Sequence, residues 1–363
     1  MKVQRITLPN QNQTSWVVLD DAYYPVLPIQ SFLTYLNNIE RSPNTVRAYA
    51  HHLKLFWEYL ADRKLNWTAV GVQEMADFIN WLRDPRPLGV TAIHARVAQR
   101  TERTINTILA AVVTFYDYHA RLGAGPDIPW YRFQALPQRR YKSFLHGVTK
   151  TKSAKTHILK LKAPKQIPKT LDSEQVTSLI NACRHRRDQF LVRLLYETGM
   201  RVGEALGLRH EDIKYWENTI WVIPRQDNRN ATRVKSGQAR RLDVNRDLLD
   251  LYLDYLSDEY GDPNNDYVFI NLWEGAVGRP MAYGTVSSLF QQIGKKVGIQ
   301  VHPHMLRHTH ATELIRQGVA LAVVARRLGH TSAQTTSQIY EHLTADDLKR
   351  EMQAFHQRKG HSQ

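Results

Sequence analysis

The segment VHPHMLRHTHATELI runs from Val301 to Ile315 and holds four histidines around one arginine. Pro303 favours the first turn of a helix, and His304, Arg307 and His308 then fall on neighbouring helix faces. Histidines four residues apart also occur on zinc-binding helices. The segment is therefore compatible with a metal site or with an anion site on a helix.

The residues around these histidines favour the anion. A guanidinium at Arg307 would repel a dication, and Glu313 is rotated about half a turn from His304 around a helix. We expect a phosphate as the ligand, with no metal and no cofactor. The remaining histidines are expected to pack or to form hydrogen bonds: His302, His308 and His310.

Composition points to a nucleic-acid partner. The 363 residues carry a net charge of +15, although a basic enzyme of another class could have the same balance. The single cysteine, Cys183, excludes an internal disulfide and fits a reducing compartment. No apolar run approaches the roughly 20 residues of a membrane span, and the N-terminal residues lack the apolar stretch of a signal peptide. We expect a soluble, cytoplasmic, nucleoid-associated protein without membrane contact.

The patterning divides the chain into five parts. Residues 1–27 form an N-terminal extension with two short strands, VQRITLP and SWVVLDD. Residues 28–125 predict a bundle of about four helices, because apolar residues recur at spacings of three and four. Residues 126–169 read as a basic interdomain linker, residues 170–345 as a second domain, and residues 346–363 as a C-terminal helix and tail.

The expected linker has an unusual charge distribution. Ten lysines and arginines and no acidic residue lie between Arg139 and Lys169. A run of solvated charges is the simplest interpretation, but the absence of interspersed acids favours a strap along DNA phosphates. The residues expected to make these contacts are Arg139, Arg140, Lys150 and Lys152.

The second domain mixes helices with a few strands. Asp172 and Gln175 form a capping-box pattern, and an apolar helix follows at DQFLVRLLYETGM. DIKYWENTIWVIPR and RRLDVN predict a three-stranded antiparallel sheet, with a turn at Glu217 and Asn218. The fold class is thus mainly α with a small antiparallel β-sheet.

Four segments, taken in order, resemble the tyrosine recombinase (phage integrase) family. That family carries Arg, Lys, His-x-x-Arg, His or Trp, and then Tyr. TGMRVGEALGL supplies Arg201 with the acidic Glu204, and RVKSGQARRLDV supplies Lys235. HPHMLRHTHATELI and LGHTSAQTTSQIYEHL supply the other four residues of the pattern: His304, Arg307, His330 and Tyr340.

The resemblance covers residues 170 to 345, and SPNTVRAYAHHLKLFWEYL is similar to the helical core-binding domain of the same family. It implies an N-terminal helical core-binding domain plus an α+β tyrosine recombinase catalytic domain, and DNA contacts at Thr45 and Arg47. Size and this segment are most similar to transposon-encoded recombinases. Two departures concern Lys235: its loop is long and contains Arg229 and Arg233, and the following strand lacks the proline of many relatives.

The family chemistry assigns a role to each residue. Arg201 and Arg307 clamp the non-bridging phosphate oxygens. Tyr340 attacks the phosphorus to give a 3′-phosphotyrosyl link, and Lys235 protonates the leaving 5′-oxygen. The other three act around them: His304 in proton transfer and phosphate contact, His330 as a hydrogen-bond donor, and Glu204 in orienting the cations.

The resemblance implies double-stranded DNA with specific recombination sites as the substrate. It implies a tetramer of the protein on DNA, a Holliday junction, and accessory recombinases or DNA-bending proteins. Two alternatives remain at this point: a type IB topoisomerase, which shares the phosphotyrosine chemistry, and a non-catalytic DNA-binding regulator. In the tail, Leu348, Met352 and Phe355 form an apolar stripe that packs either on its own domain or on a neighbouring protomer.

Overall fold

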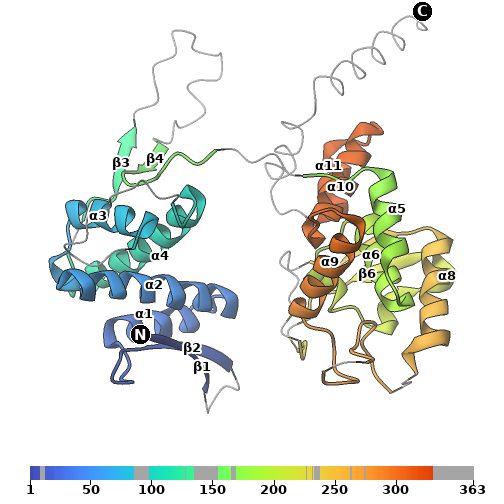
Figure 1. Ribbon diagram of the computed structural model, residues 1–363, viewed down its shortest axis with the longest axis horizontal. Coiled ribbons are helices and arrows are strands. Elements are labelled where there is room, and N and C mark those ends of the chain that lie inside the picture. The colour runs from blue at the N-terminus through green and yellow to red at the C-terminus, as the bar shows by residue number, and fades with distance from the viewer. Residues whose placement is uncertain are drawn as a thin grey trace, which may run out of the picture. The chain divides into compact units, whose positions relative to one another are not determined.

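The computed structural model describes most of the chain, in these ranges: 1–8, 13–85, 98–126, 128–134, 154–164, 169–225, 227–230, 232, 238–261, 264–273 and 275–329. Several predicted functional residues lie outside them: Arg139, Arg140, Lys150, Lys152, Lys235, His330 and Tyr340, together with the C-terminal helix. The chain forms two compact units, Met1–Lys165 and Gln166–Gln363 (Figure 1). No helix in the described part is long and apolar enough to cross a membrane.

Unit 1 begins with the two predicted strands. They form one antiparallel hairpin, in which Val3 lies opposite Val18, and the hairpin packs on the second helix. Four helices follow, as the periodicity predicted. The elements are β1 (Lys2–Leu8), β2 (Gln13–Leu19), α1 (Leu27–Asn38), α2 (Pro43–Arg63), α3 (Val72–Arg83) and α4 (Glu102–Arg121).

Local sequence explains where α2 begins and what the bundle buries. The Ser42 hydroxyl accepts a hydrogen bond from the Thr45 backbone NH at 3.2 Å, and Pro43 occupies the first turn. Most aromatic residues of the bundle lie in or against its core, as expected. The phenylalanines among them are fully buried: Phe32, Phe56, Phe78 and Phe115.

Part of the expected linker belongs to unit 1. Strands β3 (Tyr131–Gln134) and β4 (Ala154–His157) pair antiparallel, and the side chain of Asn106 in α4 forms two hydrogen bonds of 2.9 Å with the backbone of Leu161. The cause is a set of apolar residues within the basic stretch. Trp130 is buried in the unit 1 core, and Leu159 and Leu161 pack against it.

Unit 2 contains the predicted three-stranded antiparallel sheet, in the order β5-β6-β7, whose buried residues share one apolar core with the helices of the unit. The Asp172 capping box begins α5 as predicted, and α6 packs on α5, α8 and α10 (Figure 1). The elements are α5 (Ser173–Ala182), α6 (Arg186–Thr198), α7 (Val202–Ala205), β5 (Ile213–Lys214), β6 (Thr219–Val222), β7 (Arg240–Asp243), α8 (Arg246–Tyr255), α9 (Tyr283–Val297), α10 (Pro303–Arg316) and α11 (Leu321–Leu328).

Candidate active site

A tight turn at Gly199 brings the predicted arginine to the site. Gly199 ends α6 with a φ of +62°, and a Cβ atom there would lie 2.6 Å from the His310 ring and 2.7 Å from the Leu328 side chain. Glycine is therefore required by the backbone angle and by the close approach of α10 and α11. The turn places Arg201 at the N-cap of α7. Because α7 has only four residues, the helix contributes little of the partial positive charge expected there.

Arg307 joins three segments that are distant in sequence. Its side chain is buried, Nη1 donates to the Gly199 carbonyl at 2.6 Å, and Nη2 donates to the Leu328 carbonyl at 2.8 Å. The two acceptors are 108 and 21 residues away along the chain. Arg307 thus fixes α10 against the turn that carries Arg201 and against the residue two positions before His330.

Glu204 is the buried anion of the cluster. Its Oε1 accepts from Arg201 Nη1 at 2.9 Å, and its Oε2 accepts from the Arg201 backbone NH at 2.8 Å. Arg240 donates to the same two oxygens, at 3.2 Å and 2.6 Å. Burial acts to raise the pKa of Glu204, but the hydrogen bonds and charges of Arg240 and Arg201 outweigh it and hold the pKa below its usual value. The carboxylate therefore stays ionised between two arginines.

The cluster has an excess of positive charge. Arg201, Arg240 and Arg307 are balanced only by Glu204 within this group, which leaves two net positive charges. Burial, and after it the nearby charge of Arg201, lowers the pKa of Arg307 to about 9, so that its guanidinium remains protonated at neutral pH. An anion bound here would relieve the repulsion between these cations. This electrostatic arrangement suits a phosphate.

The structure brings Arg201, Glu204 and Arg307 together, as the sequence predicted. His304 occupies the first turn of α10 and is exposed, with its ring centroid 6.4 Å from that of His308. Arg240 was missed. Its only sequence signal was its position in the strand that follows the Lys235 loop.

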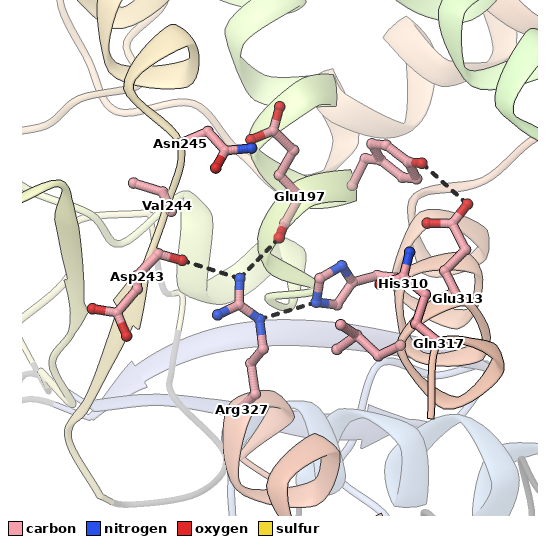
Figure 2. A pocket seen from close by; sticks show the side chains of 10 residues that line it. Glu197, Asp243, Val244, Asn245, His310, Glu313, Gln317 and Arg327 are labelled. Carbon is pink, nitrogen blue, oxygen red and sulfur yellow. Dashed lines mark hydrogen bonds between the residues drawn. The ribbon is translucent and has the colours of Figure 1, made fainter. Parts of the chain in front are cut away.

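Arg327 in α11 lines a pocket together with His310, Glu197 and Asp243 (Figure 2). Its Nε donates to His310 Nε2 at 3.1 Å, and its Nη2 donates to the carbonyls of Glu197 and Asp243, at 3.0 Å and 3.2 Å. Burial, and then the charges of Arg327 and Arg307, lower the pKa of His310 to about 4, which suits an uncharged acceptor. His310 therefore has the hydrogen-bonding role expected of it. A cavity of about 220 Å³ lies beside this group.

The two predicted DNA contacts in unit 1 differ in their surroundings. The hydroxyl of Thr45 lies 2.8 Å from that of Ser42, within the cap of α2. Arg47 is exposed, and its guanidinium lies 5.2 Å from the ring centroid of Trp16 in β2. The hairpin and α2 thus present a basic and an aromatic side chain together.

Two other tyrosines lie near the site in sequence. Tyr267 is buried, and its hydroxyl accepts a hydrogen bond from the Arg229 backbone NH at 3.0 Å. Tyr283 is 56% exposed at the start of α9.

Comparison with known proteins identifies the family. Residues 169–347 match the Phage integrase family, and residues 29–123 match the Phage integrase, N-terminal SAM-like domain. Transposase A from transposon Tn554 of Staphylococcus aureus is 42% identical over 362 residues, which cover 99% of each chain. The chain belongs to the phage integrase family of tyrosine recombinases. It is a site-specific DNA recombinase, as the four segments predicted.

Other relatives agree with this assignment. Tyrosine recombinase XerA from Pyrococcus horikoshii is 26% identical to this recombinase, over 88% of this chain and 90% of that one. The Tn1549 transposon integrase, solved in complex with a circular intermediate DNA, has a TM-score of 0.63 at 15% identity and covers 90% of this chain and 99% of that one. XerH in its post-cleavage complex gives 0.60 at 18% identity, with 90% and 84% covered. These structures confirm the two-domain fold of the recombinase.

The buried position of Glu204 predicts a pH-dependent loss of stability in the recombinase. At pH 7, Glu204→Gln should lower the free energy of unfolding of unit 2 by about 3 kcal/mol, because the buried carboxylate is lost as the counterion of two partly buried arginines, Arg201 and Arg240. The folded-state pKa is depressed, so the stabilisation is complete above the unfolded value of 4.5 and is lost as the pH falls through the folded value. Urea unfolding at pH 7 and at the lowest pH that keeps both proteins folded will measure this.

The exposed Glu217 in the same unit provides the control. Glu217→Gln should change stability by less than about 0.5 kcal/mol at either pH. If the cost of Glu204→Gln is the same at both values, the Glu204 carboxylate does not carry the charge that we assign to it.

Proposed function

We propose that this recombinase cuts and rejoins DNA through a 3′-phosphotyrosyl link formed by Tyr340, and that it does so for a mobile element. The observation that carries the proposal is the pair of hydrogen bonds from Arg307 to the carbonyls of Gly199 and Leu328. These bonds hold the turn that carries Arg201, which itself bonds Glu204, against the end of α11. His330 and Tyr340 follow directly in the sequence. The similarity to Transposase A along 99% of both chains supports the transposition role.

The charges support an in-line displacement at phosphorus. The Tyr340 oxygen gives up its proton to His304 and forms a bond to phosphorus while the bond to the 5′-oxygen breaks. Lys235 donates the proton that the leaving oxygen takes up. The phosphate carries one negative charge before attack and close to two in the transition state. The net charge of the arginine cluster therefore matches the transition state better than the ground state. Rejoining is the same step reversed, with a new 5′-hydroxyl as the attacking group.

The proposed reacting groups favour a metal-independent reaction. Six side chains supply the clamp, the nucleophile and the acid: Arg201, Lys235, His304, Arg307, His330 and Tyr340. We expect cleavage to proceed at an unchanged rate in excess EDTA. The measurement is covalent trapping of DNA with and without the chelator, and an absolute requirement for a divalent ion would contradict the proposed chemistry.

The DNA substrate can be found with the protein itself. Covalent trapping on genomic DNA, followed by sequencing of the trapped ends, will identify the sequence at which the protein cleaves. We call a double-stranded DNA that contains this sequence the site duplex. On a supercoiled plasmid with two copies of this sequence, we expect deletion or inversion products. Relaxation alone would favour the type IB topoisomerase alternative, and binding without any cleavage would favour a regulator. Phosphate contacts of the cationic Arg47, Arg139, Arg140, Lys150 and Lys152 should make affinity strongly salt-dependent, whereas the proposed contact of Thr45 is neutral and should not.

Recombination between two sites requires several protomers, and we propose a tetramer on paired DNA sites, within the nucleoid. We place the C-terminal helix, with its stripe of Leu348, Met352 and Phe355, on a neighbouring protomer. Burial of three apolar side chains, at about 1.5–3 kcal/mol each before entropy, is enough to bias assembly. Accessory recombinases or DNA-bending proteins are proposed partners, and adding them to the same reaction tests them.

Truncation after Thr344 tests this placement of the helix. The truncated protein should bind one site duplex normally, form fewer paired-site complexes and recombine poorly, because only the contact between protomers is removed. Light scattering and native electrophoresis of the protein–DNA complexes will measure their size. Tetramers of unchanged stability would place the helix on its own domain.

A further inference from the structure

Arg240 lies in β7 and is the arginine of the cluster that the family pattern did not supply. Its side chain is 10% exposed. Besides its two hydrogen bonds to Glu204, its Nε donates to the Arg327 carbonyl at 2.9 Å. One guanidinium therefore binds a carboxylate in the first catalytic segment and the backbone near the end of α11.

The turn after α11 is built closely around this guanidinium. Gly329 has a φ of +65°, and a Cβ atom there would lie 2.8 Å from Arg240 Nη1 and 3.1 Å from its Cζ. A side chain at position 329 would displace the arginine. The residue that follows Gly329 in the sequence is His330, and Tyr340 comes ten positions later.

A second arginine makes the reverse connection. Arg240 on β7 donates to the carbonyl of Arg327, and Arg327 on α11 donates to the carbonyl of Asp243, at the other end of β7. Figure 2 shows Arg327 reaching Asp243 and Glu197 at once. The end of α11 is thus fastened to β7 by two reciprocal hydrogen bonds.

We propose that Arg240 is a positioning residue for strand cleavage. It holds the Glu204 carboxylate, and with it Arg201, at a fixed place relative to the turn that leads into His330 and Tyr340. It acts through these groups and does not touch the reacting atoms. The proposal rests on the proposed function, because it assumes that the segment after Gly329 delivers the nucleophile.

Three substitutions test this role. Arg240→Gln removes the charge and most of the hydrogen bonds, and Arg240→Lys keeps the charge but not the planar fork that can bind both Glu204 oxygens and a carbonyl. Arg241→Gln is the matched control, because the Arg241 side chain is 53% exposed and pairs with Asp243 in the same strand. Each variant is assayed for binding to the site duplex, for the rate of covalent trapping at saturating protein, and for thermal unfolding.

If the catalytic groups are misplaced, the rate of strand cleavage should fall while the affinity for DNA is retained. We expect Arg240→Gln to trap DNA about 10²-fold more slowly and Arg240→Lys at least about 10-fold more slowly, with affinity within about threefold of the wild type. Arg241→Gln should match the wild type. If Arg240 acts through Glu204, the double variant Arg240→Gln with Glu204→Gln should be no more than about threefold slower than the slower single variant.

Three results would overturn the proposal. A normal cleavage rate in Arg240→Gln would remove any role for the residue, and full rescue by Arg240→Lys would show that charge alone suffices. A parallel loss of cleavage, DNA affinity and thermal stability would make Arg240 a purely structural residue. If the wild type itself traps no DNA, the proposed function fails instead, and the two failures are therefore distinct.

Discussion

Replacement of Tyr340 by phenylalanine will abolish the covalent protein–DNA adduct and leave affinity for the site duplex within about threefold of the wild type. In the proposed reaction the phenol oxygen makes the new bond to phosphorus, and a benzene ring offers no nucleophile. Protein–DNA affinity generally rests on many phosphate contacts, so one hydroxyl should contribute little to it. The measurement is trapping on labelled site duplex, paired with a binding titration.

Two other tyrosines provide matched controls. Tyr283 is exposed at the start of α9, so Tyr283→Phe should trap DNA at the wild-type rate and unfold at the wild-type temperature. Tyr267 is buried and hydrogen-bonded to the loop before Lys235, so Tyr267→Phe should lower stability and keep the adduct. If the adduct persists in Tyr340→Phe and disappears in one of the controls, the tyrosine replaced in that control is the nucleophile.

Substitution of Arg201 by lysine is expected to slow cleavage by about 10²- to 10³-fold, which is the usual cost of losing one group that stabilises transition-state charge. Lysine keeps the positive charge but cannot present two parallel N–H groups to a phosphate while it also pairs with Glu204. Single-turnover trapping at saturating protein isolates this step, and affinity for the site duplex should change by less than about threefold.

The control for this substitution is Arg186→Lys. Arg186 is about half exposed on α6 and pairs with Asp258 at 3.9 Å, so its replacement should leave cleavage unchanged. A wild-type rate in Arg201→Lys would show that the cluster needs only a charge at this position and not the geometry of a guanidinium.

Local patterns in the sequence predicted the elements that depend on local physics. The Ser42 and Asp172 caps begin helices where they were expected, because each side chain bonds a backbone NH three residues away. The two short N-terminal strands were predicted from VQRITLP and SWVVLDD, and the structure pairs them as one antiparallel hairpin. The resemblance placed Arg201, Glu204 and Arg307 in one site, where the structure has them.

Contacts between segments distant in the sequence could not be predicted from local patterns. Arg307 donates hydrogen bonds to two backbone carbonyls. Because every residue has a backbone carbonyl, no pattern of side chains in the sequence can predict which carbonyls it contacts. The Arg240 guanidinium bonds the Glu204 carboxylate 36 residues away in the chain, and that contact depends on where the fold places β7 and α7. The many charges between residues 139 and 169 predicted a linker, but Leu159 and Leu161 within this stretch pack against the core of unit 1. Those residues needed the three-dimensional fold to be recognised.

The central claim, that Tyr340 forms the link to DNA, is tested most directly by mass spectrometry of the trapped complex. Trypsin should release the peptide Leu328–Lys349, in which Tyr340 is the single tyrosine. The account predicts that this peptide carries the nucleotide, joined through the phenol oxygen to a 3′-phosphate. DNA attached to any other peptide, or joined through a 5′-phosphate, would contradict it.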